Sequence, residues 1–541
     1  MKHPSKYFIA ACLMLIGFCQ NGKAQSINNY IKGHFNGSYE NYSQTYMQDD
    51  KIGAFMPQDK IGSNSFLKLD YNFSKFSAGI QFESYLPSIL GFFPIPTTNQ
   101  SKIVNKYFKY TDNKFSVQVG DFYEQFGSGL IFRAFENRQI GINNAHEGFD
   151  IHVEPTDFLK LKVIYGRPRK LFEYANTVSR GVDAEININS LLKLKEQDNG
   201  LNILLGGSYV SKYQEYTGAI DNFPATVNAY AGRLNISTND VSISAEYINK
   251  GKDPNLLNNL SFEKGKAFQL DAAYTKNNFG ATVTYRGIYN MNFISERDVE
   301  FGSLAPVNYV PALTKQHDYL TSNIYVYAAQ GKGESGLQTD LFYTFKSGTA
   351  LGGKYGTKLS FNGSLFGALK DSNNIFGLGE KQEKYYRDIN MEIKKKLSKK
   401  MEITIGLQQI FYNSSVIQAV SNEDVTAYVI AVGGLYKFAP KKSIRFKAEH
   451  LSTKNDQGNW ASALAELSLS SPFAFFASDL FNYGKTKNHY YNVGASVTKN
   501  ATRFSLGFGK QRAGLFCVGG VCRFVPAAYG FTATLTTSFA N

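Results

Sequence analysis

Charged residues and glycines concentrate in one segment of the chain, residues 120–148. In a pore, such a segment can select a solute, because guanidinium groups attract anionic groups and carboxylates set the local field. The segment includes Asp121, Glu124, Arg133, Glu136, Arg138 and His146, among glycines at 120, 127, 129, 141 and 148. The alternative is a salt-bridged network that braces a wall or an extracellular loop. Neither interpretation requires catalysis.

Two further basic motifs are less specific. Arg167 and Arg169 flank Pro168 in YGRPRK. They either extend a basic lining or lie in an extracellular loop, where they would contact lipopolysaccharide phosphates or only solvent. The run KKKLSKK at 394–400 separates two strand-like segments, so it indicates a solvated turn rather than a nucleic-acid-binding patch. We therefore expect no nucleic-acid partner.

The sequence contains none of the common motifs of catalysis: no G-x-S-x-G, no H-E-x-x-H and no C-x-x-C. His146 and His152, near Glu147, Asp150 and Glu154, would form an acid–base or metal cluster only if a strand already begins at His146. We therefore expect a protein that is not an enzyme and that holds no metal and no cofactor.

Cys517 and Cys522 are the two cysteines outside the N-terminal segment, and they flank Gly519 and Gly520. An even pair around a tight loop in an exported protein indicates a structural disulfide. A metal site is the alternative, but no histidine lies close in the sequence to complete one.

The chain begins with an export signal, MKHPSKYFIAACLMLIGFCQNGKAQS. Basic residues precede a short apolar run and a small-residue cleavage site, so residues 1–24 are the predicted signal peptide and 25–541 the mature protein. Lipidation at Cys19 is the alternative, and the bulky Phe18 before it disfavours that reading. Loss of Lys2, Lys6 and Lys23 lowers the net charge from +14 to +11.

Alternation of apolar and polar residues runs through the rest of the chain. In FLKLDYNFSKFSAGIQFESY, Leu69 and Tyr71 share one face, whereas Lys68 and Asp70 share the other. The stretch 268–286 repeats this pattern around a turn at 276–278. Such a period of two, broken by short turns, predicts antiparallel β-hairpins. The abundance of Phe (43), Tyr (35) and Gly (48) agrees with β structure.

Short turns alternate with connectors of ten residues or more, as outer-membrane barrels alternate periplasmic turns with extracellular loops. Lys68, Asp70, Asp271 and Arg286 lie in mid-strand, where a dry core would make their unpaired charges costly. We therefore predict an all-β fold: a single transmembrane antiparallel up-and-down β-barrel of about 24 strands (22 to 26), with short periplasmic turns and long extracellular loops. Residues 129–142 and 319–331 are either strands or loop segments.

The C-terminal strand alternates Tyr529, Phe531, Leu535 and Phe539 with small polar residues. An aromatic residue near the last position is similar to the signal read by the barrel-assembly machinery of the bacterial outer membrane. Phe539 lies two residues before the end, which departs from that pattern.

The stretches 119–169 and 341–362, together with KAQS at 23–26, resemble a family of large Bacteroidota outer-membrane β-barrels catalogued as a domain of unknown function. The resemblance implies the fold and the location. The resemblance implies no catalytic residues. It is compatible with a role in type IX secretion.

Two functions follow from this reading. The first is an outer-membrane channel or facilitator for polar solutes, with a charged segment folded inward. The second is a plugged structural or translocon-associated barrel that serves secretion or envelope assembly. Because alternation begins at Ile27, we expect no separate plug domain. So wide a barrel needs a plug, a constriction or a partner, and 120–148 and 291–318 are the candidate segments. The expected partners are outer-membrane lipid, lipopolysaccharide and a periplasmic or secretion-system protein.

Overall fold

The computed structural model describes residues 33–92, 99–194, 200–218, 220, 222–298, 306–370, 374–377, 383–420, 422–470 and 472–541. The predicted signal peptide lies outside these described residues. Among them, no helix is long and apolar enough to cross a membrane.

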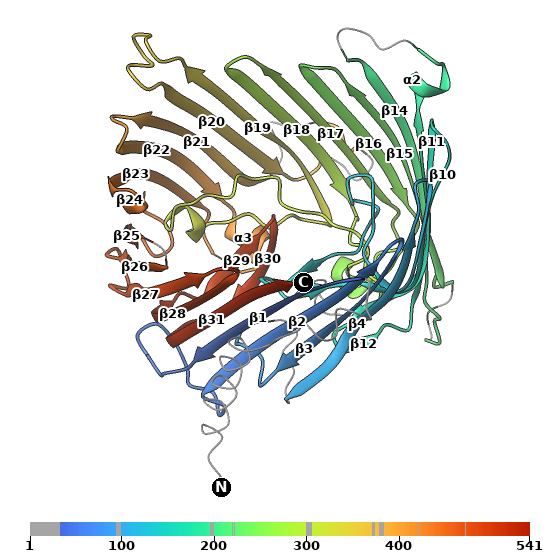
Figure 1. Cartoon of the computed structure of the whole chain (residues 1–541), viewed down its shortest axis with the longest axis horizontal. Coiled ribbons are helices and arrows are strands. Elements are labelled where there is room, and N and C mark those ends of the chain that lie inside the picture. Colours follow the sequence, from blue (N-terminus) through green and yellow to red (C-terminus); the bar gives the residue numbers. More distant parts are fainter. Residues whose placement is uncertain are drawn as a thin grey trace.

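A single antiparallel sheet forms the wall (Figure 1). Its strands are β1 (His34–Thr45), β2 (Ile61–Phe73), β3 (Phe76–Tyr85), β4 (Gln100–Thr111), β5 (Phe115–Phe122), β10 (His146–Thr156), β11 (Leu159–Lys170), β13 (Val178–Asn187), β14 (Asn202–Tyr213), β15 (Thr226–Ser237), β16 (Val241–Lys250), β17 (Gly265–Lys276), β18 (Phe279–Tyr289), β19 (Gly333–Phe345), β20 (Thr357–Gly367), β21 (Lys384–Lys396), β22 (Met401–Tyr412), β23 (Val425–Ala439), β24 (Lys442–Thr453), β25 (Trp460–Leu469), β26 (Phe473–Asn482), β27 (His489–Lys499), β28 (Thr502–Gln511) and β31 (Ala528–Ala540).

The other elements are short. They are β6 (Gln125–Phe126), β7 (Phe132–Arg133), β8 (Glu136–Asn137), β9 (Ile142–Asn143), β12 (Glu173–Tyr174), β29 (Gly514–Val518), β30 (Val521–Val525), the helices α2 (Ile188–Leu191) and α3 (Ser414–Gln418), and the 3-10 turns η2 (Leu256–Asn258) and η4 (Ser322–Ile324).

The sheet closes on itself because β1 pairs with both β2 and β31. The main sheet joins 25 strands, and without the two-residue β12 it is a barrel of 24. The predicted fold class and strand number are confirmed. Closure leaves no unpaired strand edge, which a hydrocarbon environment requires.

The two ends of the barrel differ in their connections, as predicted. At the short-turn end, Ser74 and Lys75 join β2 to β3, and Asn500 and Ala501 join β27 to β28. Asn277 and Asn500 adopt the left-handed conformation that asparagine tolerates in tight turns. Two connections at this end are longer than predicted: 188–201, which begins with α2, and 346–356. All other long connections lie at the opposite, long-loop end.

The faces of the wall also follow the predicted alternation. Exposed apolar side chains such as Tyr230 (56%) and Ile430 (53%) cover the outside. Asp70, Asp271 and Arg286 point inward, as expected. An apolar exterior around a polar interior matches a barrel surrounded by lipid.

Apolar cores fill much of the interior near the long-loop end. The first core cluster is Phe122, Phe126, Leu130, Ile131, Phe132, Ala134, Ile164, Val210, Val227, Ala229, Ile248, Ala267, Ile288, Met291, Phe293 and Val307. The second core cluster is Ala312, Ile324, Tyr325, Tyr327, Phe366, Tyr386, Ile410, Tyr412, Ile417, Val425, Ala427, Val429, Leu451, Trp460 and Leu480. Both combine wall residues with loop residues, so loops must enter the barrel.

Candidate functional site: the plugged lumen

Three connections from the long-loop end fold into the barrel, and together we call them the plug. They are residues 123–145 between β5 and β10, residues 290–332 between β18 and β19 (described except for 299–305), and residues 512–527 between β28 and β31. Figure 1 shows chain from these connections crossing the space that the strands enclose. The segments 129–142 and 319–331, left open by the sequence, are therefore loop segments and not wall strands.

The segment 123–145 touches strands on both sides of its own place in the wall. Glu246 on β16 accepts a hydrogen bond from the backbone N–H of Ser128 at 3.0 Å. Gln81 on β3 donates to Glu136 at 2.7 Å. A loop that stayed outside the barrel could not reach inward-facing residues of both strands. The expectation that this segment folds inward is what the structure shows.

Apolar packing anchors this segment. Phe126, Ile131 and Phe132 are fully buried in the first core cluster, against wall residues such as Ile248. Burial of a side chain of this size contributes about 1.5–3 kcal/mol, so the segment is held by a core rather than by charge alone.

The segment 290–332 is anchored on the opposite wall. Glu449 on β24 accepts hydrogen bonds from the N–H of Thr321 at 2.8 Å and from its hydroxyl at 2.9 Å. His317 meets Asp388 on β21 at 2.6 Å. The predicted range, 291–318, missed the part around η4. Tyr325 and Tyr327 from that part lie in the second core cluster.

The third segment carries the cysteine pair. Cys517 and Cys522 form a disulfide between β29 and β30. The turn of this hairpin holds the second segment, because Gly520 O accepts a hydrogen bond from Ala312 N at 2.7 Å and Gly519 O accepts one from the Tyr309 hydroxyl. The disulfide thus closes a hairpin that fastens the plug.

Glu136 and Arg138, two predicted constriction residues, form an ion-pair cluster with Glu40 of β1. The Arg138 guanidinium lies 2.9 Å from Glu40 and 3.0 Å from Glu136. Burial opposes the charge of Arg138, but these carboxylates outweigh it and raise the pKa of the guanidinium. Arg138 therefore ties the plug to the wall and is not free to attract an anion.

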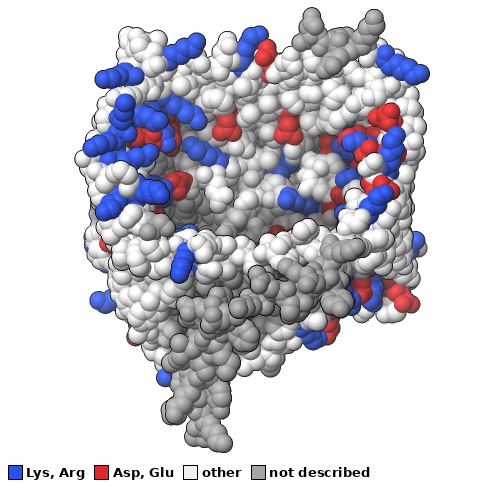
Figure 2. All heavy atoms as spheres, in the orientation of Figure 1, with Lys and Arg blue, Asp and Glu red and all other residues white. Residues whose placement is uncertain are grey.

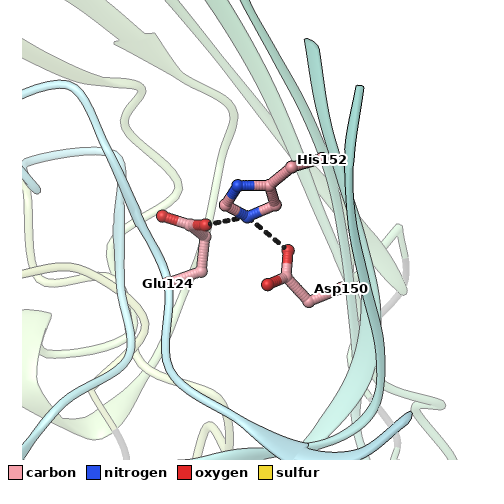
Figure 3. Close-up of side chains that lie close together, drawn as sticks. All are labelled: Glu124, Asp150 and His152. Carbon is pink, nitrogen blue, oxygen red and sulfur yellow. Dashed lines mark hydrogen bonds and ion pairs between the residues drawn. The ribbon is translucent and has the colours of Figure 1, made fainter. Parts of the chain in front are cut away.

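Glu124 lies between two cationic groups of the wall, beside Asp150 (Figure 3). Its carboxylate is 2.6 Å from His152 Nε2 and 2.9 Å from Lys162 Nζ, and His152 is 3.1 Å from Asp150. Burial favours the neutral acid, yet the hydrogen bonds from His152 and Lys162 hold the pKa of Glu124 at about 2. This carboxylate is a charged anchor of the plug.

The ligand atoms of Glu124, Asp150 and His152 lie within 4.8 Å of one another, which is a spacing that a divalent ion could use. Such an ion would have to displace the proton between His152 and the carboxylates and compete with Lys162. His146 is not part of this group. It is buried elsewhere, 3.2 Å from the Ser179 hydroxyl, so the two histidines named by the sequence do not meet.

Arg133 and Arg169 are also occupied. The Arg133 guanidinium lies 4.0 Å from the centre of the Tyr309 ring and 4.8 Å from that of Phe135. Arg169 forms two hydrogen bonds to Glu83, at 2.6 and 3.0 Å, and both side chains are buried. Arg133 joins two segments of the plug, because Tyr309 and Phe135 come from different connections. Arg169 joins β11 to β3 through Glu83.

The prediction that Arg167 lines the lumen is wrong. Asp121 and Arg167 are both cross-strand neighbours of Glu147, which links β5, β10 and β11. By alternation Arg167 shares a face with Tyr165, which is exposed on the outside of the barrel (43%). Asp121 is buried and accepts hydrogen bonds from the Lys106 N–H and the Tyr174 hydroxyl, both at 2.8 Å. Arg167 pairs with Glu147 at 2.9 Å. Arg167 and Arg169 belong to β11 rather than to an extracellular loop.

A polar cavity of about 510 Å³ lies beside segment 123–145, in the short-turn half of the lumen. Figure 2 shows this face of the molecule hollowed, with acidic and basic side chains on its walls. The residues around the cavity are Gln125, Gly127, Ser128, Lys160, Lys162, Asp183, Glu185, Arg233, Asn235, Ser244, Glu246, Gln269 and Asp271. Arg233 and Asp183 form an ion pair there at 2.8 Å.

With this geometry in view, comparison with protein families gives one match, which spans residues 4–539. The chain belongs to DUF6029, a family of unknown function. This confirms the expected kind of family, whereas its expected restriction to Bacteroidota stays a prediction. Comparison with curated protein sequences finds no match.

Solved structures similar to this DUF6029 member are outer-membrane barrels. A chain of the E. coli P pilus tip assembly intermediate PapC-PapD-PapK-PapG matches with TM-score 0.49 and 10% identity over 94% of this chain, which spans 61% of that chain. The P pilus usher (PapC) translocation pore gives 0.44 and 9%, covering 94% and 99%. A BenF-like porin from Pseudomonas fluorescens gives 0.33 and 10%, covering 94% and 97%. Since these scores are below 0.5, the assignment of the fold depends on the closed strand order of this chain.

Sequence patterns did not single out Lys212 or Lys250, and Arg286 faces a dry interior rather than the wet lumen expected for it. Lys212 and Lys250 surround Asp253, with Lys212 at 2.5 Å, and all three side chains are fully buried. Arg286 meets Glu334 at 2.7 Å, again without exposure. Alternation places Lys212, Lys250 and Arg286 inside, but no sequence spacing shows which acid from a loop or another strand meets them.

Proposed function

We propose that this protein is an outer-membrane channel for small polar solutes, whose lumen is narrowed by its own plug. The observation that carries the proposal is the polar cavity of about 510 Å³ in the lumen, beside the plug. Charged and amide side chains from β11, β13, β15, β16 and β17 converge on it. A wall that only supported a permanent seal would not need such a lining.

The cavity suits solutes that exchange hydrogen bonds with water for hydrogen bonds with side chains. Glu185 and Asp271 line the cavity and have no ion-pair partner among the described residues. Asp271 accepts hydrogen bonds from Gln269 at 2.9 Å and from Thr284 at 2.7 Å, so Glu185 is the carboxylate more available to cationic or hydroxyl groups. Arg233, held by Asp183, is a fixed donor beside them. Side chains of both signs bind polar solutes weakly enough for release, which conduction requires.

The proposal includes the orientation and the route of export. The long-loop end faces the cell exterior and the short-turn end the periplasm, following the usual arrangement of such barrels. The signal peptide 1–24 is cleaved, and the barrel-assembly machinery reads the last strand with Tyr529, Phe531, Leu535 and Phe539. Phe531 and Phe539 lie on the outer surface (45% and 48% exposed), where a recognition factor can reach them. The protein acts without catalysis, surrounded by membrane lipid and lipopolysaccharide.

A second candidate is a permanently plugged barrel that serves secretion or envelope assembly. The observation in its favour is the packing of the plug, which is anchored by two apolar core clusters and by the hairpin with the Cys517–Cys522 disulfide. A plug of this kind opens only if those cores are disrupted. This candidate predicts no conductance in the intact protein.

Single-channel conductance in planar bilayers separates the two functions. The parent is compared with a variant in which a short Gly-Ser linker replaces 124–144. A variant with the turn 346–356 shortened serves as the control, because it changes the opposite end of the barrel. Small, steady conductance in the parent, enlarged by the plug deletion and unchanged by the turn deletion, supports the channel. A silent parent with a conducting plug deletion supports the plugged barrel and overturns the channel.

A further inference from the structure

The rim at the short-turn end has two parts that differ in charge pairing. Around β2 to β18, lysines of one turn pair with an aspartate of a neighbouring turn. Lys75 lies 2.5 Å from Asp112, Lys114 lies 2.8 Å from Asp157, and Lys276 lies 2.8 Å from Asp240. The lysine hydrogen bonds lower the pKa of Asp112 and of Asp157. At these three turns the lysine charges are neutralised by the protein itself.

The turns that follow β19, β21 and β23 form a lysine patch without this pairing. On the left of Figure 2, Lys and Arg side chains gather, with Asp and Glu side chains among them, where Figure 1 places β20 to β24. Lys394 pairs with Glu402 at 2.8 Å, and the other lysines of these turns form no ion pair within the part of the chain that the structure describes. We call this set the lysine patch: Lys346, Lys354, Lys395, Lys399, Lys400, Lys441 and Lys442.

The patch continues from the turns into the mouth of the barrel. Lys437 lies between Tyr436 and Phe438, which are exposed on the outer face (43% and 38%), so alternation directs Lys437 inward. Lys358 also faces the mouth, with its ammonium 5.2 Å from the centre of the inward-facing Phe342 ring. Unpaired cations are therefore present both on the turns and inside the opening.

We propose that the lysine patch and the mouth beside it bind an acidic polypeptide segment from the periplasmic side. Many like charges are held close together on three turns and repel one another. An anionic partner would lower this repulsion, which favours its binding. Headgroups of the surrounding lipid lie outside the barrel and cannot reach Lys358 and Lys437. A small anion would engage only a few of the lysines, whereas an extended acidic chain can follow them from the turns into the mouth.

The test uses the full barrel in nanodiscs of zwitterionic lipid and a fluorescent poly-glutamate peptide of about twenty residues, with poly-glutamine as the uncharged probe. The patch variant is K399Q/K400Q/K441Q. The matched control, K75Q/K114Q/K276Q, removes the same number of charges from the paired part of the rim. Folding of each is checked by the heat-dependent mobility of the barrel on a gel. We expect poly-glutamate binding about tenfold weaker in the patch variant, changed by less than about twofold in the control, and weakened by added salt.

Equal losses in the two variants would show attraction to overall positive charge and overturn the proposal. Absence of poly-glutamate binding by the parent would also overturn it. In that case, loss of co-purifying anionic phospholipid from the patch variant alone would assign the lysine patch to the membrane. Conductance plays no part in these readouts, so the proposal can fail or hold independently of the channel function.

Discussion

The two halves of the barrel interior differ in polarity and packing. In the long-loop half, inward side chains such as Ile248 and Ile288 are apolar, and plug residues such as Phe132 pack against them as in a soluble protein. In the short-turn half, inward positions of β16 and β17 carry Glu246 and Asp271 around a cavity. One strand can therefore have lipid on its outer face and, on its inner face, a dry core at one end and a polar lumen at the other.

This difference determines what a charge does. A charge in the dry half must be paired, because desolvation of an unpaired ion costs several kcal/mol. A charge at the rim keeps its water and gains little from a partner. The same residue types should therefore give large effects in the dry interior and small ones at the rim.

The largest contrast is expected for two arginines. Arg286→Met leaves Glu334 buried without its cation, which should lower the free energy of unfolding by about 3–5 kcal/mol. Arg445→Met removes the cation of the half-exposed pair with Glu466 and should change it by less than about 1 kcal/mol. Urea unfolding of the parent and the two variants in detergent micelles measures both changes in the free energy of unfolding. Equal losses would contradict the division of the interior into two halves.

A smaller effect is expected when Glu124 is protonated. Its pKa is about 2 in the folded protein and 4.5 in its ordinary state. A lowered folded pKa stabilises the protein above pH 4.5, and this stabilisation is lost as the pH falls from 4.5 toward 2. Its size is on the order of 3 kcal/mol. The protection factor of amide hydrogen exchange in 124–144 should therefore decrease over this pH range in the parent.

Glu124→Gln is the matching variant for this pH dependence. In this variant, the protection factor of amide hydrogen exchange in 124–144 should be lower already at pH 7. Its dependence on pH between 4.5 and 2 should be weaker than in the parent. A parent profile that stays flat in this range would show that Glu124 does not anchor the plug.

The disulfide should have a local effect. In Cys517→Ser/Cys522→Ser, the short hairpin loses a crosslink whose contribution by loop-closure entropy is about 2 kcal/mol. Because the hairpin holds Tyr309 and Ala312, limited proteolysis should cut 306–330 faster than in the parent, while cleavage near α2 stays unchanged. Equal acceleration at both places would indicate general unfolding instead.

The smallest effect is expected at the paired part of the rim. Lys114→Gln removes an ion pair whose lysine and aspartate are both exposed (61% and 87%). We expect no measurable change in the thermal midpoint of the barrel. A clear decrease would show that rim pairs stabilise the wall, and it would weaken the distinction between dry and wet charges.

Much of the fold could be predicted because the relevant signals are local. A β-strand alternates its faces, so Leu69 with Tyr71 and Lys68 with Asp70 are separated within a few residues. Turn and loop lengths are equally local, and their alternation together with the outward apolar rows leads to a closed barrel of 24 strands. The pair Cys517 and Cys522 is similarly close in sequence, and the structure joins it.

The arrangement inside the barrel could be decided only by the tertiary structure. Arg167 follows a charged stretch of sequence but lies on the outer face, whereas Glu124 pairs with Lys162 and Arg138 with Glu40 of the first strand. The sequence does not encode these distances locally, because they depend on where a closing sheet brings remote strands and on which loops enter it. A buried charge takes the partner that closure brings within reach, and that partner can be anywhere in the chain.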